Sequence, residues 1–277
     1  MRDAISKMFD FNGKNILVVG GTSGINLGIA RAFARAGGRV AVASRKQDKV
    51  DAAVKLLTLD NGAVQPFGVT FDVRDNDAVL SGIAQVAEAF GTLDVLVSGA
   101  AGNFPASASG MSANGFKSVM DIDLLGSFQV LKASYPYLAR PGVILQISAP
   151  QAFVPMPMQA HVCAAKAGVD MLTRTLPLEW SKEGIRINSI VPGPIEDTEG
   201  FDRLAPSAEL KKRVAQSVPV GRNGSVDDIA AAALFLASPL ASYINGVVLP
   251  VDGGWSLGGA SIAMTELGAI AARQLKA

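Results

Sequence analysis

The chain has 277 residues, of which 49% are hydrophobic and 18% charged, and its formal net charge is +1. This composition is typical of a packed globular protein and excludes the disordered and fibrous classes. Lys and Arg form no conspicuous cluster, so we expect no nucleic-acid partner. The single cysteine, Cys163, excludes an internal disulfide and a multi-cysteine metal site, and we expect no bound metal.

Short apolar runs rich in β-branched residues predict strands that are buried on both faces. In chain order they are residues 16–19, 40–43, 95–97, 143–147, 187–191 and 247–251. The stretches between them are long enough for helices, and two of these, 27–36 and 79–90, end before Gly37 and Gly91. This alternation predicts an α/β fold with a doubly wound parallel sheet in three α/β/α layers, as a single domain over residues 1–277.

The loops that follow strands are the candidates for function, because ligands bind such sheets beyond the carboxyl ends of the strands. Two of them, residues 102–112 and 192–206, are long and polar or rich in Gly and Pro. We expect both to lie over the ligand end, with a substrate loop at about 193–215 and a C-terminal tail at about 255–277.

A glycine-rich loop joins the first predicted strand to the first predicted helix. Its residues are Gly20, Gly21, Thr22, Ser23, Gly24, Ile25 and Asn26. Glycines allow a tight turn and a close approach of the backbone to a pyrophosphate, and a helix N-terminus offers that group N–H donors and a positive dipole end. The loop therefore predicts a dinucleotide cofactor; a tight turn without a ligand is the alternative.

The end of the second predicted strand indicates which dinucleotide to expect. An acidic residue at this point normally holds the ribose hydroxyls of NAD, but this chain has Ser44, Arg45 and Lys46. The two cations lie where NADP carries its 2′-phosphate, so the sequence favours NADP(H). Two solvated surface cations are the alternative.

More motifs follow the glycine loop. They are Asp72, Ser98-Gly99-Ala100-Ala101-Gly102, Lys166, Pro192-Gly193-Pro194 and Asp252-Gly253-Gly254. In this order they resemble the short-chain dehydrogenase/reductase family over essentially the whole chain. The resemblance implies a Rossmann fold in which Asp72 touches the adenine and Lys166 holds the nicotinamide ribose. The implied cofactor-binding residues are Gly20, Thr22, Ser23, Gly24, Ile25, Ser44, Arg45, Lys46, Asp72, Val73, Gly99, Ala100, Lys166, Pro192, Pro194 and Ile195.

The chain departs from this family at the residues of carbonyl chemistry. Ordinary members use a Tyr as proton donor, a Ser that orients the carbonyl and an Asn that anchors a water chain; these positions hold Val162, Ala149 and Asp123. Neither Val nor Ala donates a proton, and a general acid is typically worth about 10²- to 10⁴-fold in rate, so ketone reduction is disfavoured. Asn26 is a further departure, because it replaces the third glycine of the loop, and we expect it to narrow the cofactor cleft.

Local motifs are most similar to those of the 2,4-dienoyl-CoA reductases. They are residues 100–104, 120–123 with Gly126, 165–170, and 192–195 leading to 198–200. This resemblance implies reduction of a 2,4-dienoyl-CoA to a 3-enoyl-CoA by NADPH, with negative charge delocalised into a thioester enolate. Two alternatives stay open: an ordinary alcohol or 3-oxoacyl-thioester dehydrogenase with an unusual acid such as His161, and an NADP-binding protein without catalytic activity.

Five residues are candidates for catalysis under this hypothesis. Lys166 anchors the ribose and supplies positive charge, and Asp123 holds the water that protonates the dienolate, unless it only caps a helix or forms a salt bridge. Asp170 lies four residues after Lys166 and is expected to pair with it on one helix face. His161 and Gln151 are candidates to donate a hydrogen bond to the thioester oxygen.

The substrate side, the assembly and the location are predicted more coarsely. Asn103 and Phe104 are expected to contact the acyl chain of an acyl-CoA, as is the run 155–158, whose methionines would otherwise fill core. Because there is no signal-peptide pattern and no run of about 18 apolar residues, we expect a cytoplasmic protein without a membrane partner. The family resemblance implies a homotetramer, assembled through helices at 111–140 and 161–181.

Overall fold

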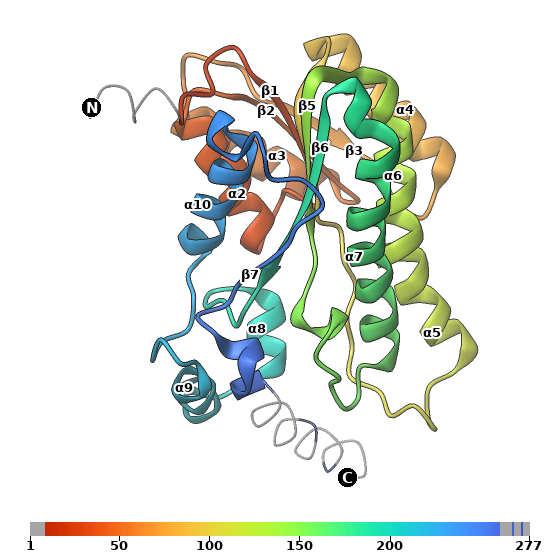
Figure 1. The fold of residues 1–277 in the computed structure, drawn as a ribbon, viewed down its shortest axis with the longest axis vertical. Coiled ribbons are helices and arrows are strands. Elements are labelled where there is room, and N and C mark those ends of the chain that lie inside the picture. Colours follow the sequence, from red (N-terminus) through yellow and green to blue (C-terminus); the bar gives the residue numbers. More distant parts are fainter. Residues whose placement is uncertain (1–8, 261–267, 269–272, 274–277) are drawn as a thin grey trace.

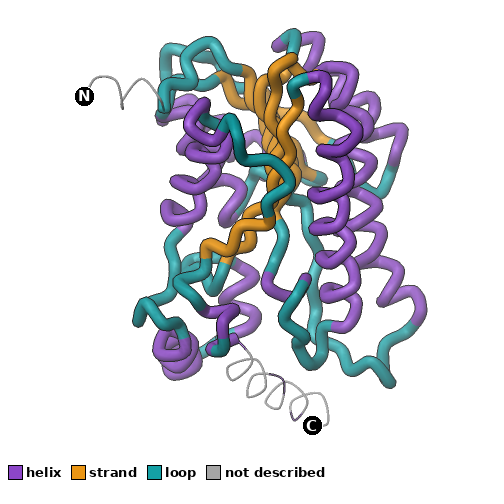
Figure 2. The backbone as a smooth tube through the Cα atoms, in the orientation of Figure 1, coloured by secondary structure: helices purple, strands orange, loops and turns teal. Residues whose placement is uncertain are grey.

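The computed structural model describes residues 9–260 together with residues 268 and 273. Its centre is a seven-stranded sheet with the order β3-β2-β1-β4-β5-β6-β7, in which every pair of neighbouring strands is parallel. Helices cover both faces of this sheet (Figure 2). The predicted single-domain, doubly wound α/β fold is therefore confirmed.

The strands are β1 (Asn15–Val19), β2 (Arg39–Ser44), β3 (Phe67–Thr70), β4 (Leu93–Ser98), β5 (Leu138–Ile147), β6 (Ile185–Pro192) and β7 (Val248–Val251). One face of the sheet is covered by α2 (Gly24–Arg35), α3 (Gln47–Asp60) and α10 (Val226–Ala237), and the other by α4 (Asn76–Phe90), α6 (Gly126–Ser134) and α7 (Ala160–Trp180) (Figure 1). The sheet thus separates two hydrophobic cores.

Strand β1 shows why the predicted strands are continuous apolar runs. Ile16 and Val18 point into the core beneath α2, α3 and α10, whereas Leu17 and Val19 point into the core beneath α4, α6 and α7. Successive side chains of a strand face opposite sides, so a strand covered on both sides is apolar at every position. The six predicted runs lie in β1, β2 and β4 to β7. Strand β3 has no such apolar run, because only Val69 in it is buried.

The prediction of one helix over residues 111–140 is wrong. The segment divides into α5 (Ala113–Val119), a π-helical turn (Met120–Leu125), α6 and a short 3₁₀ turn, and β5 then begins at Leu138. Two prolines, Pro136 and Pro141, lie at this point, and proline cannot continue a helix. Leu138 instead pairs with Leu93 of β4.

The two predicted loops differ in structure. Residues 102–112 contain no helix, whereas 192–206 contains α8 (Glu199–Leu204), which α9 (Ala208–Ser217) follows. Most of the predicted tail at 255–277 lies outside the described residues; its start forms a 3₁₀ turn at Trp255–Leu257.

Among the described residues, none of the helices combines the length and the apolar character that crossing a membrane requires.

Candidate active site

A cavity of about 800 Å³ lies beyond the carboxyl ends of the strands. The loops after β1 to β6 all contribute to its walls, as expected at the ligand end of a doubly wound sheet. Every residue predicted to bind the cofactor lines it. Lys49, which no sequence motif indicated, also lines it, as does Asn26 of the glycine loop. The predicted substrate loop and the start of the predicted tail contribute further lining residues, namely Gly193, Thr198, Glu199, Gly200, Phe201, Arg203, Ala205, Val214 and Trp255.

The glycine loop has the backbone that a pyrophosphate site needs. Gly20 and Gly24 adopt positive φ angles of 79° and 52°, which L residues other than glycine rarely adopt. A Cβ on Gly20 would also lie 3.0 Å from the backbone nitrogen of Ala100. The side chain of Ser23, at the N-cap of α2, forms no capping hydrogen bond, so it leaves the N–H groups of the first turn to a ligand.

Positive charge lines the cavity at the end of β2. Arg45 and Lys46 lie there, and α3 brings Lys49 beside them, because residues three apart share a helix face. Asp72, at the predicted adenine position, accepts hydrogen bonds from the Arg74 guanidinium, which hold the pKa of this carboxyl below its usual value.

Lys166 and Asp123 form a buried ion pair in the same cavity. Lys166 Nζ lies 3.3 Å from Asp123 Oδ2 and donates a hydrogen bond to the carbonyl of Ile147 at 3.2 Å. Asp123 Oδ1 accepts a hydrogen bond from the Gly102 N–H at 2.7 Å, whereas its Oδ2 has no well-aligned hydrogen bond. The π-helical turn between α5 and α6 contains Asp123, and such turns are frequent at functional sites.

Asp170 does not pair with Lys166 as predicted. It lies behind the cavity, where its Oδ1 accepts a hydrogen bond from the hydroxyl of Ser189 at 3.3 Å. Burial raises the pKa of this carboxyl, more than the nearby hydroxyls and cations lower it. The Lys166 ammonium instead lies 3.3 Å from the buried Asp123 carboxylate, which comes from a different helical segment, so the predicted Lys166–Asp170 pair along one helix face is not formed.

His161 and Phe104 pack against each other outside the cavity lining. Their rings pack edge to face with centroids 4.6 Å apart, and neither ring lines the cavity. His161 is fully buried, and neither of its ring nitrogens has a hydrogen bond. Burial lowers the pKa of His161, more than the nearby backbone of Gln159 and Phe104 raises it. The imidazole is therefore neutral near pH 7, and it packs against the loop that carries Phe104.

The remaining candidates divide between the cavity and the core. Gln151 and Asn103 line the cavity, and the Gln151 amide donates a hydrogen bond to Gln159 Oε1 at 2.6 Å. Val162 and Ala149 also line it, so its wall is apolar where ordinary family members carry Tyr and Ser. Met156, from the run 155–158, does not line the cavity but is buried in a small cluster with Trp255 of the cavity wall, which favours the core alternative for this methionine.

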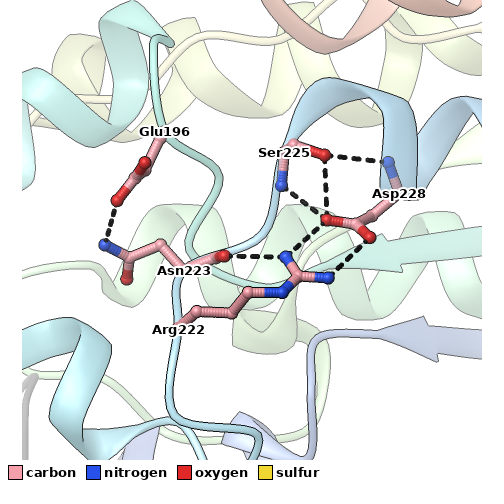
Figure 3. Close-up of polar contacts among 5 residues, drawn as sticks. All are labelled: Glu196, Arg222, Asn223, Ser225 and Asp228. Atoms are coloured by element: carbon pink, nitrogen blue, oxygen red, sulfur yellow. Dashed lines mark hydrogen bonds and ion pairs between the residues drawn. The ribbon is translucent and has the colours of Figure 1, made fainter.

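The segment after β6 is held by contacts with Asn223 and Gly224, shortly before α10 begins (Figure 3). Ile195 forms a parallel β-bridge with Gly224, and Glu196 accepts a hydrogen bond from the Asn223 amide at 2.9 Å. Arg222 donates two hydrogen bonds to Asp228, at 2.8 and 2.9 Å. These contacts hold the segment that flanks the predicted nicotinamide site.

Asp228 makes this corner sensitive to pH. It also accepts a hydrogen bond from the Ser225 N–H at 2.7 Å, in a capping box. Hydrogen bonds from Arg222 hold the pKa of Asp228 well below its usual value. A carboxyl with a lowered pKa in the folded state stabilises the protein above its unfolded pKa of about 4, and this contribution is lost as the pH falls through the folded value.

Replacing Asp228 with Asn is expected to lower the free energy of unfolding by about 1 kcal/mol at pH 7, since both groups are partly exposed. The difference from the unmodified protein should shrink as the pH falls below about 4. Urea unfolding across this pH range measures it, with Asp227→Asn in the same helical turn as the control. A difference that stays constant with pH would contradict the assignment.

Comparisons with known proteins agree with this geometry. A family model described as enoyl-(acyl carrier protein) reductase matches residues 19–256. A rat protein named peroxisomal 2,4-dienoyl-CoA reductase [(3E)-enoyl-CoA-producing] is 43% identical over 244 residues, which cover 87% of this chain and 83% of the relative. A Bacillus subtilis protein named probable 2,4-dienoyl-CoA reductase [(2E)-enoyl-CoA-producing] is 41% identical over 245 residues, covering 87% and 96%.

Solved structures show the same relationship. A short chain dehydrogenase from Bacillus anthracis is 38% identical, with a TM-score of 0.78 over 90% of this chain and 97% of that one. A Sinorhizobium meliloti structure, titled a putative short-chain alcohol dehydrogenase, is 30% identical, with a TM-score of 0.85 over 91% and 99%.

Proposed function

Because the chain belongs to the short-chain dehydrogenase/reductase family and is an oxidoreductase that uses a nicotinamide cofactor, we propose that it reduces a 2,4-dienoyl-CoA to a 3-enoyl-CoA with NADPH. The observation that carries the proposal is the buried Lys166–Asp123 pair in a cavity whose Tyr and Ser positions hold Val162 and Ala149. This site has an acid–base pair but lacks the proton donor of carbonyl reduction.

The residues present fit a phosphorylated dinucleotide. Positive-φ glycines and a free helix N-terminus suit the pyrophosphate, and Arg45, Lys46 and Lys49 suit a 2′-phosphate. Lys166 would hold the nicotinamide ribose. When bound, NADPH supplies the hydride.

Charge develops on the substrate after hydride reaches the far end of the diene. The electrons delocalise into the thioester enolate, and the Lys166 ammonium, which is buried in the cavity wall, stabilises this charge. Asp123 Oδ2, which has no well-aligned hydrogen bond, holds a water that donates a proton to the carbon next to the thioester. The overall change adds one hydride and one proton to the diene.

The experiment that tests this function follows NADPH oxidation with 2,4-hexadienoyl-CoA, acetoacetyl-CoA and, as a cofactor control, NADH. Turnover of the dienoyl thioester alone supports the proposal. Turnover of acetoacetyl-CoA would overturn it in favour of a 3-oxoacyl-thioester dehydrogenase, and tight NADPH binding without any turnover would favour a non-catalytic protein. NMR of the product separates a 3-enoyl from a 2-enoyl thioester, the two products that the relatives' names distinguish.

Cofactor preference gives a separate prediction. Replacing both Arg45 and Lys46 with Ala is expected to raise the KM for NADPH by about 10- to 100-fold and to leave the KM for NADH unchanged, because two charge-assisted contacts to the 2′-phosphate are lost. Steady-state kinetics with both cofactors measures this, with the exposed Lys55→Ala on α3 as the control. An equal change with both cofactors would contradict a 2′-phosphate site.

Assembly and location stay proposals. We propose a homotetramer, which the exposed apolar side chains Phe128 of α6 and Met171 and Leu178 of α7 support. Light scattering of the purified protein tests the subunit number. The cytoplasmic location stays a prediction, and several relatives are named as peroxisomal proteins.

A further inference from the structure

Asn26 occupies the third-glycine position of the cofactor loop without needing a glycine-like backbone. It is the third residue of α2 and helical, and the positive φ angles of the loop belong to Gly20 and Gly24. The departure at this position therefore causes no backbone strain. What distinguishes Asn26 from a glycine is its side chain.

The Asn26 side chain bonds to the end of a neighbouring strand. Its Nδ2 donates a hydrogen bond to the carbonyl of Gly99, directly after β4, at 2.7 Å. A Cβ on Gly99 would lie only 2.4 to 2.6 Å from the Asn26 amide, so the amide fills the space that Gly99 leaves open. The bond also fixes the orientation of the amide, because only its nitrogen can donate to a carbonyl; its Oδ1 is buried without a partner.

The strand end that Asn26 holds also reaches the buried ion pair. The Gly99 N–H donates to the Val19 carbonyl of β1 at 3.1 Å, and three residues later the Gly102 N–H donates to Asp123 Oδ1 at 2.7 Å. The segment 99–102 therefore lies between the glycine loop and Asp123. The hydrogen bond from the Asn26 side chain to the Gly99 carbonyl attaches this segment to the glycine loop.

We propose that Asn26 is a positioning residue that fixes the segment 99–102 against the cofactor loop, so that cofactor and Asp123 are held in one arrangement. A glycine at position 26 cannot make this contact. The turnover part of the proposal rests on the proposed function, whereas the cofactor-binding part does not.

The test compares Asn26→Gly, which restores the usual family residue, and Asn26→Ala, which keeps a good helix former, with the exposed Asn76→Ala as control. NADPH binding is titrated by its fluorescence without substrate, and kcat and KM are measured with 2,4-hexadienoyl-CoA. Both Asn26 variants are expected to raise the Kd for NADPH about 3- to 10-fold, the range of one hydrogen bond, and to lower kcat by a similar factor. Transfer from 4-deuterated NADPH should show a larger isotope effect, because a misplaced nicotinamide slows the hydride step.

Two results would overturn the proposal. An unchanged Kd in both variants would show that the Asn26 contact does not hold the cofactor site, and a raised Kd with unchanged kcat and isotope effect would show that the contact does not extend to the reacting groups. Should the unmodified protein bind NADPH but fail to reduce hexadienoyl-CoA, the proposed function fails, and the Kd comparison alone decides for or against Asn26. Thermal unfolding without cofactor identifies a variant that is merely misfolded.

Discussion

Replacing Lys166 with Met is expected to lower kcat/KM for a 2,4-dienoyl-CoA by at least about 10²- to 10³-fold and to weaken NADPH binding. The ammonium is the cation that contacts Asp123, and it lines the cavity where the cofactor and the enolate would meet. A methionine fills a similar volume but supplies neither charge nor hydrogen bonds. Fluorescence titration with NADPH and initial rates with hexadienoyl-CoA measure the two losses.

The same substitution has a structural consequence that can be separated from catalysis. It leaves the Asp123 carboxylate buried without its cation, which is expected to reduce the free energy of unfolding by about 3–5 kcal/mol. In the double variant Asp123→Asn, Lys166→Met both charges are gone, so most of this stability should return while activity stays lost. Turnover by a stable double variant would contradict the role of the pair.

Sequence patterns were sufficient for six of the seven strands and for the cofactor loop, but not for β3, in which only Val69 is buried. The runs in β1 and β2 are apolar at every position because two layers of helices cover them, and this composition is visible without any structure. The glycine loop was predicted for a similar reason, since the positive φ angles of Gly20 and Gly24 restrict those positions to glycine. Burial on both faces of a strand and a positive φ angle each restrict the residue type at one position, so both can be recognised in the sequence.

The partners of the site residues depended on tertiary structure. Spacing on one helix made Asp170 the expected partner of Lys166, but the π-helical turn in the segment predicted as one helix brings Asp123 within 3.3 Å of the ammonium. His161 is a candidate donor because it lies next to Val162 at the usual Tyr position, yet its ring packs against Phe104 and does not line the cavity. No hydrophobic periodicity in the sequence indicates the π-helical turn or the direction in which the His161 ring packs.

Replacing Asp123 with Asn is expected to separate proton delivery from cofactor binding. The amide has the size of the carboxylate, and its oxygen can still accept the hydrogen bond from the Gly102 N–H, but it turns an NH₂ group toward Lys166 and cannot hold a water as a carboxylate does. NADPH binding should be retained, while kcat with hexadienoyl-CoA falls by about 10²- to 10⁴-fold, the range of a general acid–base group.

Asp121→Asn is the matched control, because Asp121 lies in the same π-helical turn but forms an exposed pair with Lys117 outside the cavity. If Asp123→Asn binds NADPH and turns over normally, bulk water protonates the dienolate and the carboxylate serves only to neutralise Lys166. If it binds NADPH without turnover, the carboxylate is required at the protonation step. A site with Val162 and Ala149 in place of Tyr and Ser can then direct a proton to carbon without donating one to a carbonyl oxygen.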